Sequence, residues 1–129
     1  SPVIVAVRDK DTRDQLSKMN AAVMGTDTDP FYGAPVVLVV LADKNRSTCV
    51  YDGSLVMGNL MNAAASLGIG SCWIHRAKEV FASEEGKALL KKWGVEGDYE
   101  GIGHCVLGYP ARDVPKAKLR KENYVYYVD

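Results

Sequence analysis

The sequence contains few cysteines, and they follow no pattern. The three present, Cys49, Cys72 and Cys105, lie far apart in a chain of 129 residues, without a CxxC pair or a Cys/His cluster. An odd and scattered set excludes a disulfide framework, and zinc sites need ligands at shorter, regular spacing. We therefore expect a cytoplasmic protein without a bound metal.

The sequence also lacks an excess of charge of either sign and a long apolar run. Its 16 basic and 16 acidic residues cancel, whereas proteins that bind nucleic acid or acidic membranes normally carry a basic excess. The longest apolar run, residues 34–42, has nine residues including Pro35, against about 20 for a membrane span. We expect no nucleic-acid partner and no membrane segment, and we interpret this run as a buried strand.

Hydrophobic residues make up 47% of the sequence, which is enough for a packed core. The length is typical of one domain, so we expect residues 1–129 to form a single domain with an extended C-terminal arm over about residues 109–129. The sequence shows no signal-peptide pattern and begins without Met, inside a strand-like run. We therefore expect the later part of a longer protein, incomplete at its N-terminus.

Hydrophobic periodicity and turn residues predict alternating strands and helices. The order of charges supports the last helix, because Ser83 precedes acidic residues in its first turn and Lys91 and Lys92 lie in its last. The predicted strands cover residues 3–7, 36–41, 70–74 and 101–108, and the predicted helices cover residues 11–24, 52–67 and 84–93.

The helix predicted over residues 52–67 is apolar on nearly every side. A helix of this kind is normally buried on nearly all sides. The sheet of one small domain covers only part of such a surface. We therefore expect a second subunit to pack on this helix, with Met57, Leu60, Met61 and Ala64 at a two-fold interface.

Two glycine pairs do not complete a nucleotide-binding motif. Residues 68–70 and 101–103 each read Gly-Ile-Gly, but Trp73 and Val106 occupy the place of the third glycine of GxGxxG. No P-loop lysine follows either pair. We expect these glycines to serve turns and close packing.

The adjacent residues His104 and Cys105 do not form a thiol–imidazole pair. Neighbouring residues on a strand point to opposite faces of the sheet, so the two side chains cannot meet. We expect a buried cysteine and a partly exposed histidine.

Two segments carry candidate binding residues. His75 and Arg76 follow a predicted strand, and loops at strand ends often carry function. Lys118 and Arg120 lie two apart in a basic tail, so an extended chain directs both toward one target. One phosphate could accept a forked arginine contact and a lysine charge together. A solvated basic arm is the alternative interpretation of the tail.

A longer stretch resembles a known family. Residues 51–76 read YDGSLVMGNLMNAAASLGIGSCWIHR, and this run closely resembles the nitroreductase family of FMN-dependent oxidoreductases. Three further segments agree with it in their order, namely FYGAPV at residues 31–36, GHCVLGYP at 103–110 and KAKLRK at 116–121. The resemblance extends over nearly the whole chain, from about Val3.

The resemblance implies an α+β fold with a central mixed β-sheet flanked by helices, in three α-β-α layers. It also implies an intertwined homodimer with two FMN molecules at the subunit interface. The residues that it assigns to FMN are Trp73, Ile74, His75 and Arg76 along the isoalloxazine ring and Lys118 and Arg120 at the phosphate. The family's N-terminal Arg/Ser-rich FMN motif, and its Asn/Gln segment before the first strand, have no counterpart in this sequence.

The function that the resemblance implies is reduction of a nitroaromatic, quinone or similar small-molecule acceptor by NAD(P)H, in a ping-pong cycle carried by FMN. No side chain is assigned a catalytic role. Phe31 and Tyr32 are candidates for lining the acceptor pocket, although packing is the more common role of such residues. Two alternatives stay open. One is a flavin-binding module without turnover, and the other is a flavin enzyme of different chemistry on the same fold, such as a reductive dehalogenase or a flavin-fragmenting enzyme.

Overall fold

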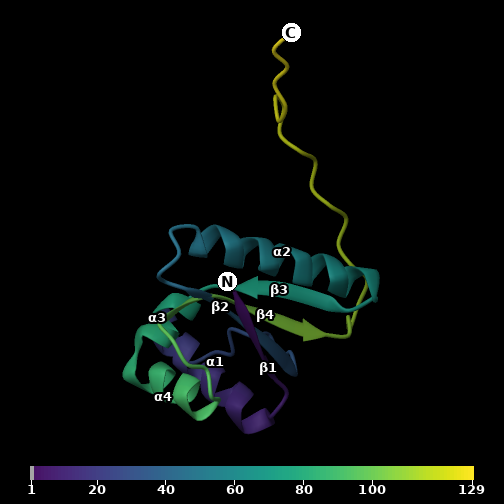
Figure 1. Ribbon diagram of the computed structural model, residues 1–129. Coiled ribbons are helices and arrows are strands. Elements are labelled where there is room, and N and C mark those ends of the chain that lie inside the picture. The colour runs from purple at the N-terminus through teal and green to yellow at the C-terminus, as the bar shows by residue number, and fades with distance from the viewer. Residues whose placement is uncertain (1) are drawn as a thin grey trace.

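The computed structural model describes residues 2–129, which form four strands and four helices. Helices lie on both faces of one sheet, so the body has three layers (Figure 1). The strands are β1 (Val3–Val7), β2 (Val36–Asp43), β3 (Gly70–Ile74) and β4 (Tyr99–Gly108), and the helices are α1 (Lys10–Met24), α2 (Cys49–Ser66), α3 (Ala77–Ala82) and α4 (Glu84–Lys92). The predicted α+β class and its layers are confirmed.

The sheet has the strand order β1-β2-β4-β3, and each neighbouring pair is antiparallel. One detail of the expected fold differs here. The resemblance implies a mixed sheet, but a mixed sheet needs a parallel pair, and the described strands form none. β3 lies at one edge, so one side of its backbone has no neighbouring strand within residues 2–129.

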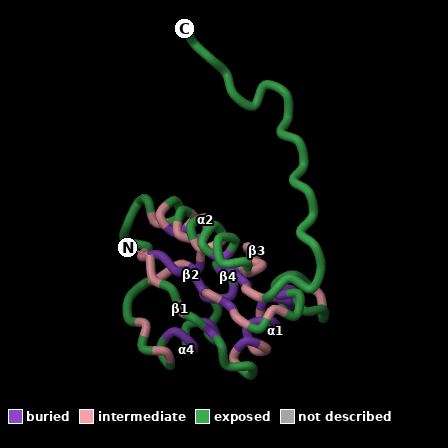
Figure 2. The backbone as a smooth tube through the Cα atoms, turned by 90° about the vertical axis from the view of Figure 1, so that its right-hand side faces the viewer, coloured by how far each residue is buried: buried purple, intermediate pink, exposed green. Residues whose placement is uncertain are grey.

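We call the sheet face that packs against α1, α3 and α4 the closed face, because its core is covered within the chain. Leu16 of α1 and Phe31 of the following loop are 0% exposed there, and Phe81 of α3 is 2% exposed. The members of this core are Val7, Leu16, Phe31, Val37, Val39, Leu41, Ile74, Ala77, Val80, Phe81, Leu89, Leu90 and Val106. Figure 2 shows the buried backbone concentrated in the central strands beneath these helices.

We call the face under α2 the open face. Its buried core is smaller and consists of Val40, Met57 and Cys105. The outer side of α2 remains uncovered, with Leu55 70% exposed. We expected a second subunit to complete the burial of this helix, and within one chain the sheet covers only one side of it.

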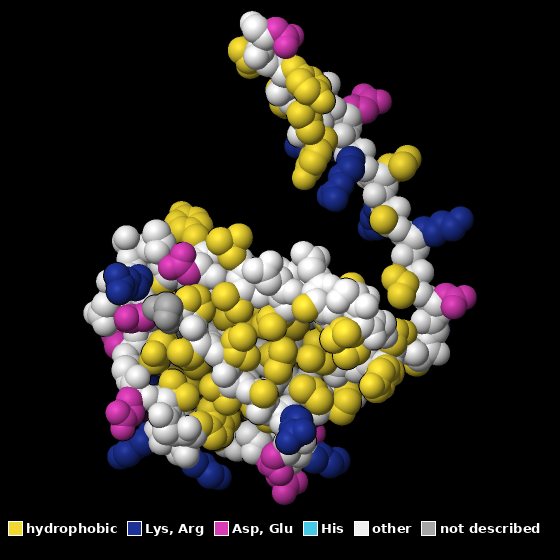
Figure 3. Space-filling view, turned by 45° about the vertical axis from the view of Figure 1, so that its right-hand side comes forward, with side chains coloured by type: hydrophobic (Ala, Val, Ile, Leu, Met, Phe, Trp, Pro, Cys, Tyr) yellow, Lys and Arg dark blue, Asp and Glu magenta, His cyan; other side chains and the backbone are white. Residues whose placement is uncertain are grey.

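Two of the residues expected at a two-fold interface, Met57 and Ala64, are buried within the chain itself. The most exposed large apolar residues of α2 and of its C-terminal end are Tyr51, Leu55 and Leu67. Figure 3 shows hydrophobic side chains gathered in a broad band across one face of the body, with others along the tail. The expected two-fold interface stays a prediction, since Leu60 and Met61 are only partly buried by their own chain.

Local signals at helix ends are confirmed. Gly25 ends α1 with a φ of 77°, a left-handed conformation that glycine adopts readily. The Ser83 hydroxyl accepts a hydrogen bond from the N–H of Gly86 at 3.0 Å and so caps α4. Helix α3 was not predicted, because six residues are too few to show a helical period.

The tail over residues 109–129 leaves the end of β4 and runs away from the body (Figure 1). All of its residues are exposed, including Leu119 and Val128 at 98% each. Its course is extended, and it pairs with no strand of the sheet within residues 2–129.

Candidate functional site

The free edge of β3 borders a cavity of about 310 Å³. The cavity is lined by β3 and the turn after it, by the end of α1 and by the loop that follows α1. These residues are Met24, Thr28, Asp29, Pro30, Tyr32, Cys72, Trp73, Ile74, His75 and Arg76. The structure thus brings all four residues that were expected along an isoalloxazine ring to one cavity. An edge strand also directs half of its backbone N–H and C=O groups away from the sheet, which provides donors and acceptors.

Trp73 and Ile74 fix β3 between the two faces of the sheet. The indole of Trp73 packs with Met57 in the open-face core, whereas Ile74 belongs to the closed-face core. Gly103 makes room for the indole, since a Cβ at this position would lie 3.0 Å from the Trp73 Cδ1. The expected role of this glycine in close packing is confirmed, and β3 contributes Cys72, Trp73 and Ile74 to the lining of the cavity.

The turn after β3 is held by a residue of α1. Arg76 has a φ of 74°, which is unusual for a residue other than glycine. Its Nε donates a hydrogen bond to Oδ1 of Asn20 at 2.8 Å, and Nδ2 of Asn20 donates to the backbone oxygen of His75 at 2.7 Å. The sequence carried no signal for this role, because a single Asn inside a helical pattern resembles any other polar position.

His104 lies beneath this turn and is 0% exposed. The expectation of a partly exposed histidine is wrong, because this position of the central strand β4 faces the closed-face core. The imidazole centroid is 5.2 Å from the ring of Phe31 and 6.0 Å from that of Phe81, and Nδ1 lies 3.3 Å from Nδ2 of Asn20. Burial lowers the pKa of His104 to about 4, so the ring is neutral at pH 7. The burial predicted for Cys105, on the opposite face, is confirmed at 0% exposure.

One carboxylate holds the loop after α1. Asp29 accepts hydrogen bonds from Nη2 of Arg13 and Oγ of Ser17, both at 2.6 Å. It also accepts from the backbone N–H groups of Phe31 at 3.0 Å and Gly33 at 2.7 Å. Partial burial raises the pKa of Asp29, but these hydrogen bonds outweigh it and hold the pKa well below its usual range. The loop that walls the cavity is therefore ordered by an ionised side chain.

The two aromatic candidates of this loop have different positions. Phe31 is 0% exposed and packs in the closed-face core, the more common role for such a residue. Tyr32 is 81% exposed, has a φ of 54° and lines the 310 Å³ cavity. With Cys72 it also lines a neighbouring cavity of about 550 Å³. Of the pair, Tyr32 is the residue placed to meet a small molecule beside β3.

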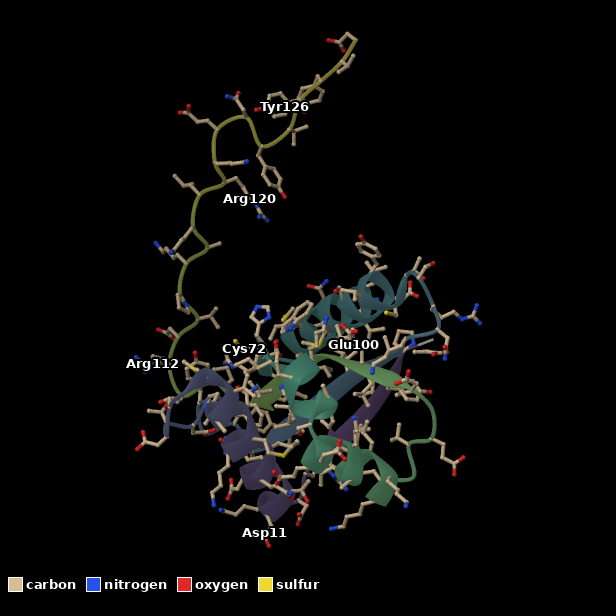
Figure 4. All side chains as sticks on the ribbon, turned by 90° about the vertical axis from the view of Figure 1, so that its left-hand side faces the viewer. Asp11, Cys72, Glu100, Arg112, Arg120 and Tyr126 are labelled. Atoms are coloured by element: carbon tan, nitrogen blue, oxygen red, sulfur yellow. The ribbon has the colours of Figure 1, made fainter. Side chains whose placement is uncertain are left out.

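Lys118 and Arg120 are not brought to this cavity. Both are exposed residues of the tail. The guanidinium carbon of Arg120 lies 5.2 Å from the ring centroid of Tyr124, a contact within the tail itself. In Figure 4 Arg120 lies far along the tail, whereas Cys72 lies on the body at β3.

Two other kinds of site are not found in the part of the chain that the structure describes. Within residues 2–129 no three His, Cys, Asp or Glu side chains are grouped so that they could hold a metal ion. None of the described helices combines the length and apolar character needed to cross a membrane.

The arrangement is that of an α+β protein with a cavity beside an edge strand of its sheet. The sequence profile of the nitroreductase family matches residues 3–109, so this chain belongs to the nitroreductase family. No curated protein matches the chain in sequence.

Solved structures show the same fold. A nitroreductase with bound FMN from Bacteroides fragilis superposes with a TM-score of 0.86 and 25% identity, over 99% of this chain and 76% of that one. A nitroreductase with bound FMN from Desulfitobacterium hafniense superposes with a TM-score of 0.83 and 21% identity, over 99% of this chain and 76% of that one. An oxidised iodotyrosine deiodinase bound to FMN and 3-iodo-L-tyrosine superposes with a TM-score of 0.70 and 20% identity, over 99% of this chain and 76% of that one.

Proposed function

We propose that this protein is an FMN-dependent oxidoreductase that binds the flavin ring at the free edge of β3. The observation that carries the proposal is the meeting of Trp73, Ile74, His75 and Arg76 at one cavity beside an unpaired strand edge. Membership of the nitroreductase family supports it, as does the FMN bound in two similar structures.

The residues present fit an isoalloxazine ring. Such a ring carries nitrogen and carbonyl groups along one part and an apolar benzenoid along the other. The free backbone edge of β3 supplies donors and acceptors for the polar part, and Met24 and Tyr32 supply apolar contact. Arg76 adds a positive charge at the cavity, which favours electrons added to the ring.

When bound, FMN supplies the redox chemistry, with NAD(P)H as donor and a nitroaromatic, quinone or similar small molecule as acceptor in a ping-pong cycle. The chain's own residues bind and orient the flavin ring. The backbone of β3 and of its turn holds the ring, and Tyr32 lines the space in which donor and acceptor would follow each other. No side chain is required as an acid or base, so we assign no catalytic residue.

We propose further that the protein acts as a homodimer. Helix α2 and its C-terminal end present Tyr51, Leu55 and Leu67, each at least 70% exposed, and exposed apolar residues of this size favour a protein partner. In the dimer Lys118 and Arg120 would hold the FMN phosphate. Their spacing supports this role, since two residues of an extended segment that lie two apart point to the same side.

The location that we propose is the cytoplasm. Its support is that Cys49, Cys72 and Cys105 are all free thiols, of which Cys72 is exposed. Free thiols persist in a reducing compartment.

The test begins with the purified protein as isolated. We expect the absorption bands of an oxidised flavin, and release of FMN on heating, identified by its mass. Recovery of FAD or haem as the main species would contradict the proposal, as would failure of the cofactor-free protein to bind added FMN. Steady oxidation of NADH or NADPH in the presence of a nitroaromatic or a quinone is the result expected of a reductase.

A second candidate function is reductive dehalogenation, favoured by the similarity to the deiodinase structure. The same assay with a halogenated phenol as acceptor distinguishes it, because halide release would then accompany flavin reoxidation. A protein that binds FMN but oxidises neither NADH nor NADPH with any of these acceptors would instead be a binding module.

A further inference from the structure

Asn20 is a fully buried polar side chain that makes all of its side-chain hydrogen bonds outside its own helix. It is 0% exposed, on the side of α1 that packs toward β3 and β4. Its partners are the backbone oxygen of His75 at 2.7 Å, Nε of Arg76 at 2.8 Å and Nδ1 of His104 at 3.3 Å. Burial of an amide is costly unless its groups are paired, and here both ends of the amide are paired. Asn20 therefore links α1 with the turn after β3 and with the central strand.

The orientation of this amide follows from its partners. The Nε of Arg76 can only donate, so it must face Oδ1 of Asn20. The carbonyl of His75 can only accept, so it must face Nδ2. The Nδ1 of His104 lies 3.3 Å from the same NH2 group, which can donate to it when the neutral ring carries its proton on Nε2. No other amide orientation satisfies the two residues of the turn.

The turn is a segment that needs such support. A left-handed backbone at a residue other than glycine persists only where its surroundings hold it, and Arg76 has a φ of 74°. On the helix side, the Arg76 carbonyl accepts from the N–H of Val80 at 3.0 Å. On the sheet side, the turn is held by the hydrogen bonds of Asn20 to the His75 carbonyl and the Arg76 side chain.

We propose that Asn20 is a positioning residue for the flavin: through the His75 carbonyl and the Arg76 side chain it fixes the turn against which the ring lies. This inference rests on the proposed FMN site. Asn20 does not line the 310 Å³ cavity, so its effect on a bound ring passes through the two residues that do. A role in packing alone would predict an effect on stability but none on how the flavin is held.

Two Asn20 variants and one control separate these roles. Asn20→Leu removes both ends of the amide at similar volume. Asn20→Asp keeps an acceptor for Arg76 but has no donor for the His75 carbonyl. Leu16→Ala is the matched control, because Leu16 lies on the same helix and is also 0% exposed, yet it does not line the cavity. Unfolding free energies are measured first, and FMN is titrated into each cofactor-free protein at a temperature where all are folded.

We expect Asn20→Leu and Asn20→Asp to bind FMN at least about tenfold more weakly than wild type and Leu16→Ala to bind it as wild type does. We also expect the two Asn20 variants to shift the midpoint potential of bound FMN, by about 30 mV for each tenfold change in the ratio of reduced to oxidised affinity. Leu16→Ala should leave the potential unchanged.

Wild-type affinity and potential in Asn20→Asp would overturn the inference while leaving the FMN site intact. Equal weakening in Leu16→Ala would overturn it too, as would loss of the fold in both Asn20 variants when the control folds. If the wild-type protein itself binds no FMN, the proposed function and this inference both fail.

Discussion

The two faces of the sheet differ in how far one chain completes them. On the closed face, three helices cover a core that includes fully buried Phe31 and Leu16. On the open face, α2 covers Met57 and Cys105 but leaves Leu55 70% exposed. The β3 edge and the tail are similarly open, since within residues 2–129 neither has a neighbouring strand on its free side. The difference indicates that the closed face stabilises the fold, whereas the open face, the β3 edge and the tail are the parts available for binding.

Two adjacent aromatic residues give the strongest test of this difference. Phe31→Ala should lower the free energy of unfolding by about 3–5 kcal/mol, because it leaves a cavity in the closed-face core. Tyr32→Ala should change it by about 0.5 kcal/mol or less, because Tyr32 is 81% exposed, while weakening the binding of an aromatic acceptor. Denaturant unfolding measures both variants. Similar losses in the two would contradict the division between a stabilising face and a binding edge.

The next largest effect is a loss of stability in acid through His104. Its pKa is lowered to about 4 in the folded protein, and the unfolded value is about 6.5. The unfolded state therefore binds the proton first, so this contribution is complete above pH 6.5 and is lost as the pH falls to about 4. The expected loss is about 3 kcal/mol over this window.

Unfolding in denaturant at a series of pH values measures the slope, and His104→Phe is the control. The variant should show a flatter dependence between pH 6.5 and 4, since it has no group that titrates there. Asp29 acts in a lower window, because its depressed pKa makes its contribution disappear only as the pH falls below its ordinary value. An unchanged slope in His104→Phe would mean that the histidine is not buried as described.

The tail should affect binding and not stability. Removal of one charge-assisted hydrogen bond to the FMN phosphate costs roughly 1.5–3 kcal/mol, so Lys118→Ala and Arg120→Ala should each bind FMN about 10- to 100-fold more weakly. The effect should be larger at low salt, because an exposed contact is screened. Lys121→Ala is the matched control on the other side of an extended arm. Equal weakening by Lys121→Ala and Arg120→Ala would mean that the tail acts only through its overall positive charge, and it would contradict a specific contact of Arg120 with the phosphate.

The smallest expected effect compares the N-terminal caps of two helices. Ser83 caps α4 through the N–H of Gly86, so Ser83→Ala should cost about 1 kcal/mol of stability. Thr48 precedes α2 without a capping hydrogen bond from its side chain, so Thr48→Ala should lower the free energy of unfolding by only about 0.3 kcal/mol. Thermal unfolding compares the two. A larger loss at Thr48 would mean that the cap on the open face is stronger than its geometry indicates.

The parts that could be predicted from sequence are those with local causes. The bounds of β1 and β3, the Gly25 end of α1 and the Ser83 cap depend on residues a few positions apart. The candidate segment from Trp73 to Arg76 was found through a family resemblance, and the structure brings these residues to one cavity.

The parts that could not be predicted depend on contacts between distant residues. Asn20 contacts His75 and His104, which lie 55 and 84 positions away in the sequence. No pattern within a helix predicts such distant partners. The burial of His104 was missed for the same reason, since it is covered by Phe31 and Phe81 from other elements. The exposed side of α2 could not be located from sequence, because composition shows how apolar a helix is, but not which of its sides one chain covers.

The central claim is that FMN lies at the β3 edge and its turn, and hydrogen exchange with and without FMN tests it most directly. Exchange of backbone amides would be followed by mass spectrometry in the cofactor-free protein and again with saturating FMN. We predict slower exchange over residues 72–76 and unchanged exchange in α4, which lies on the closed face. Slower exchange in α4 with none over residues 72–76, while FMN is bound, would contradict the claim.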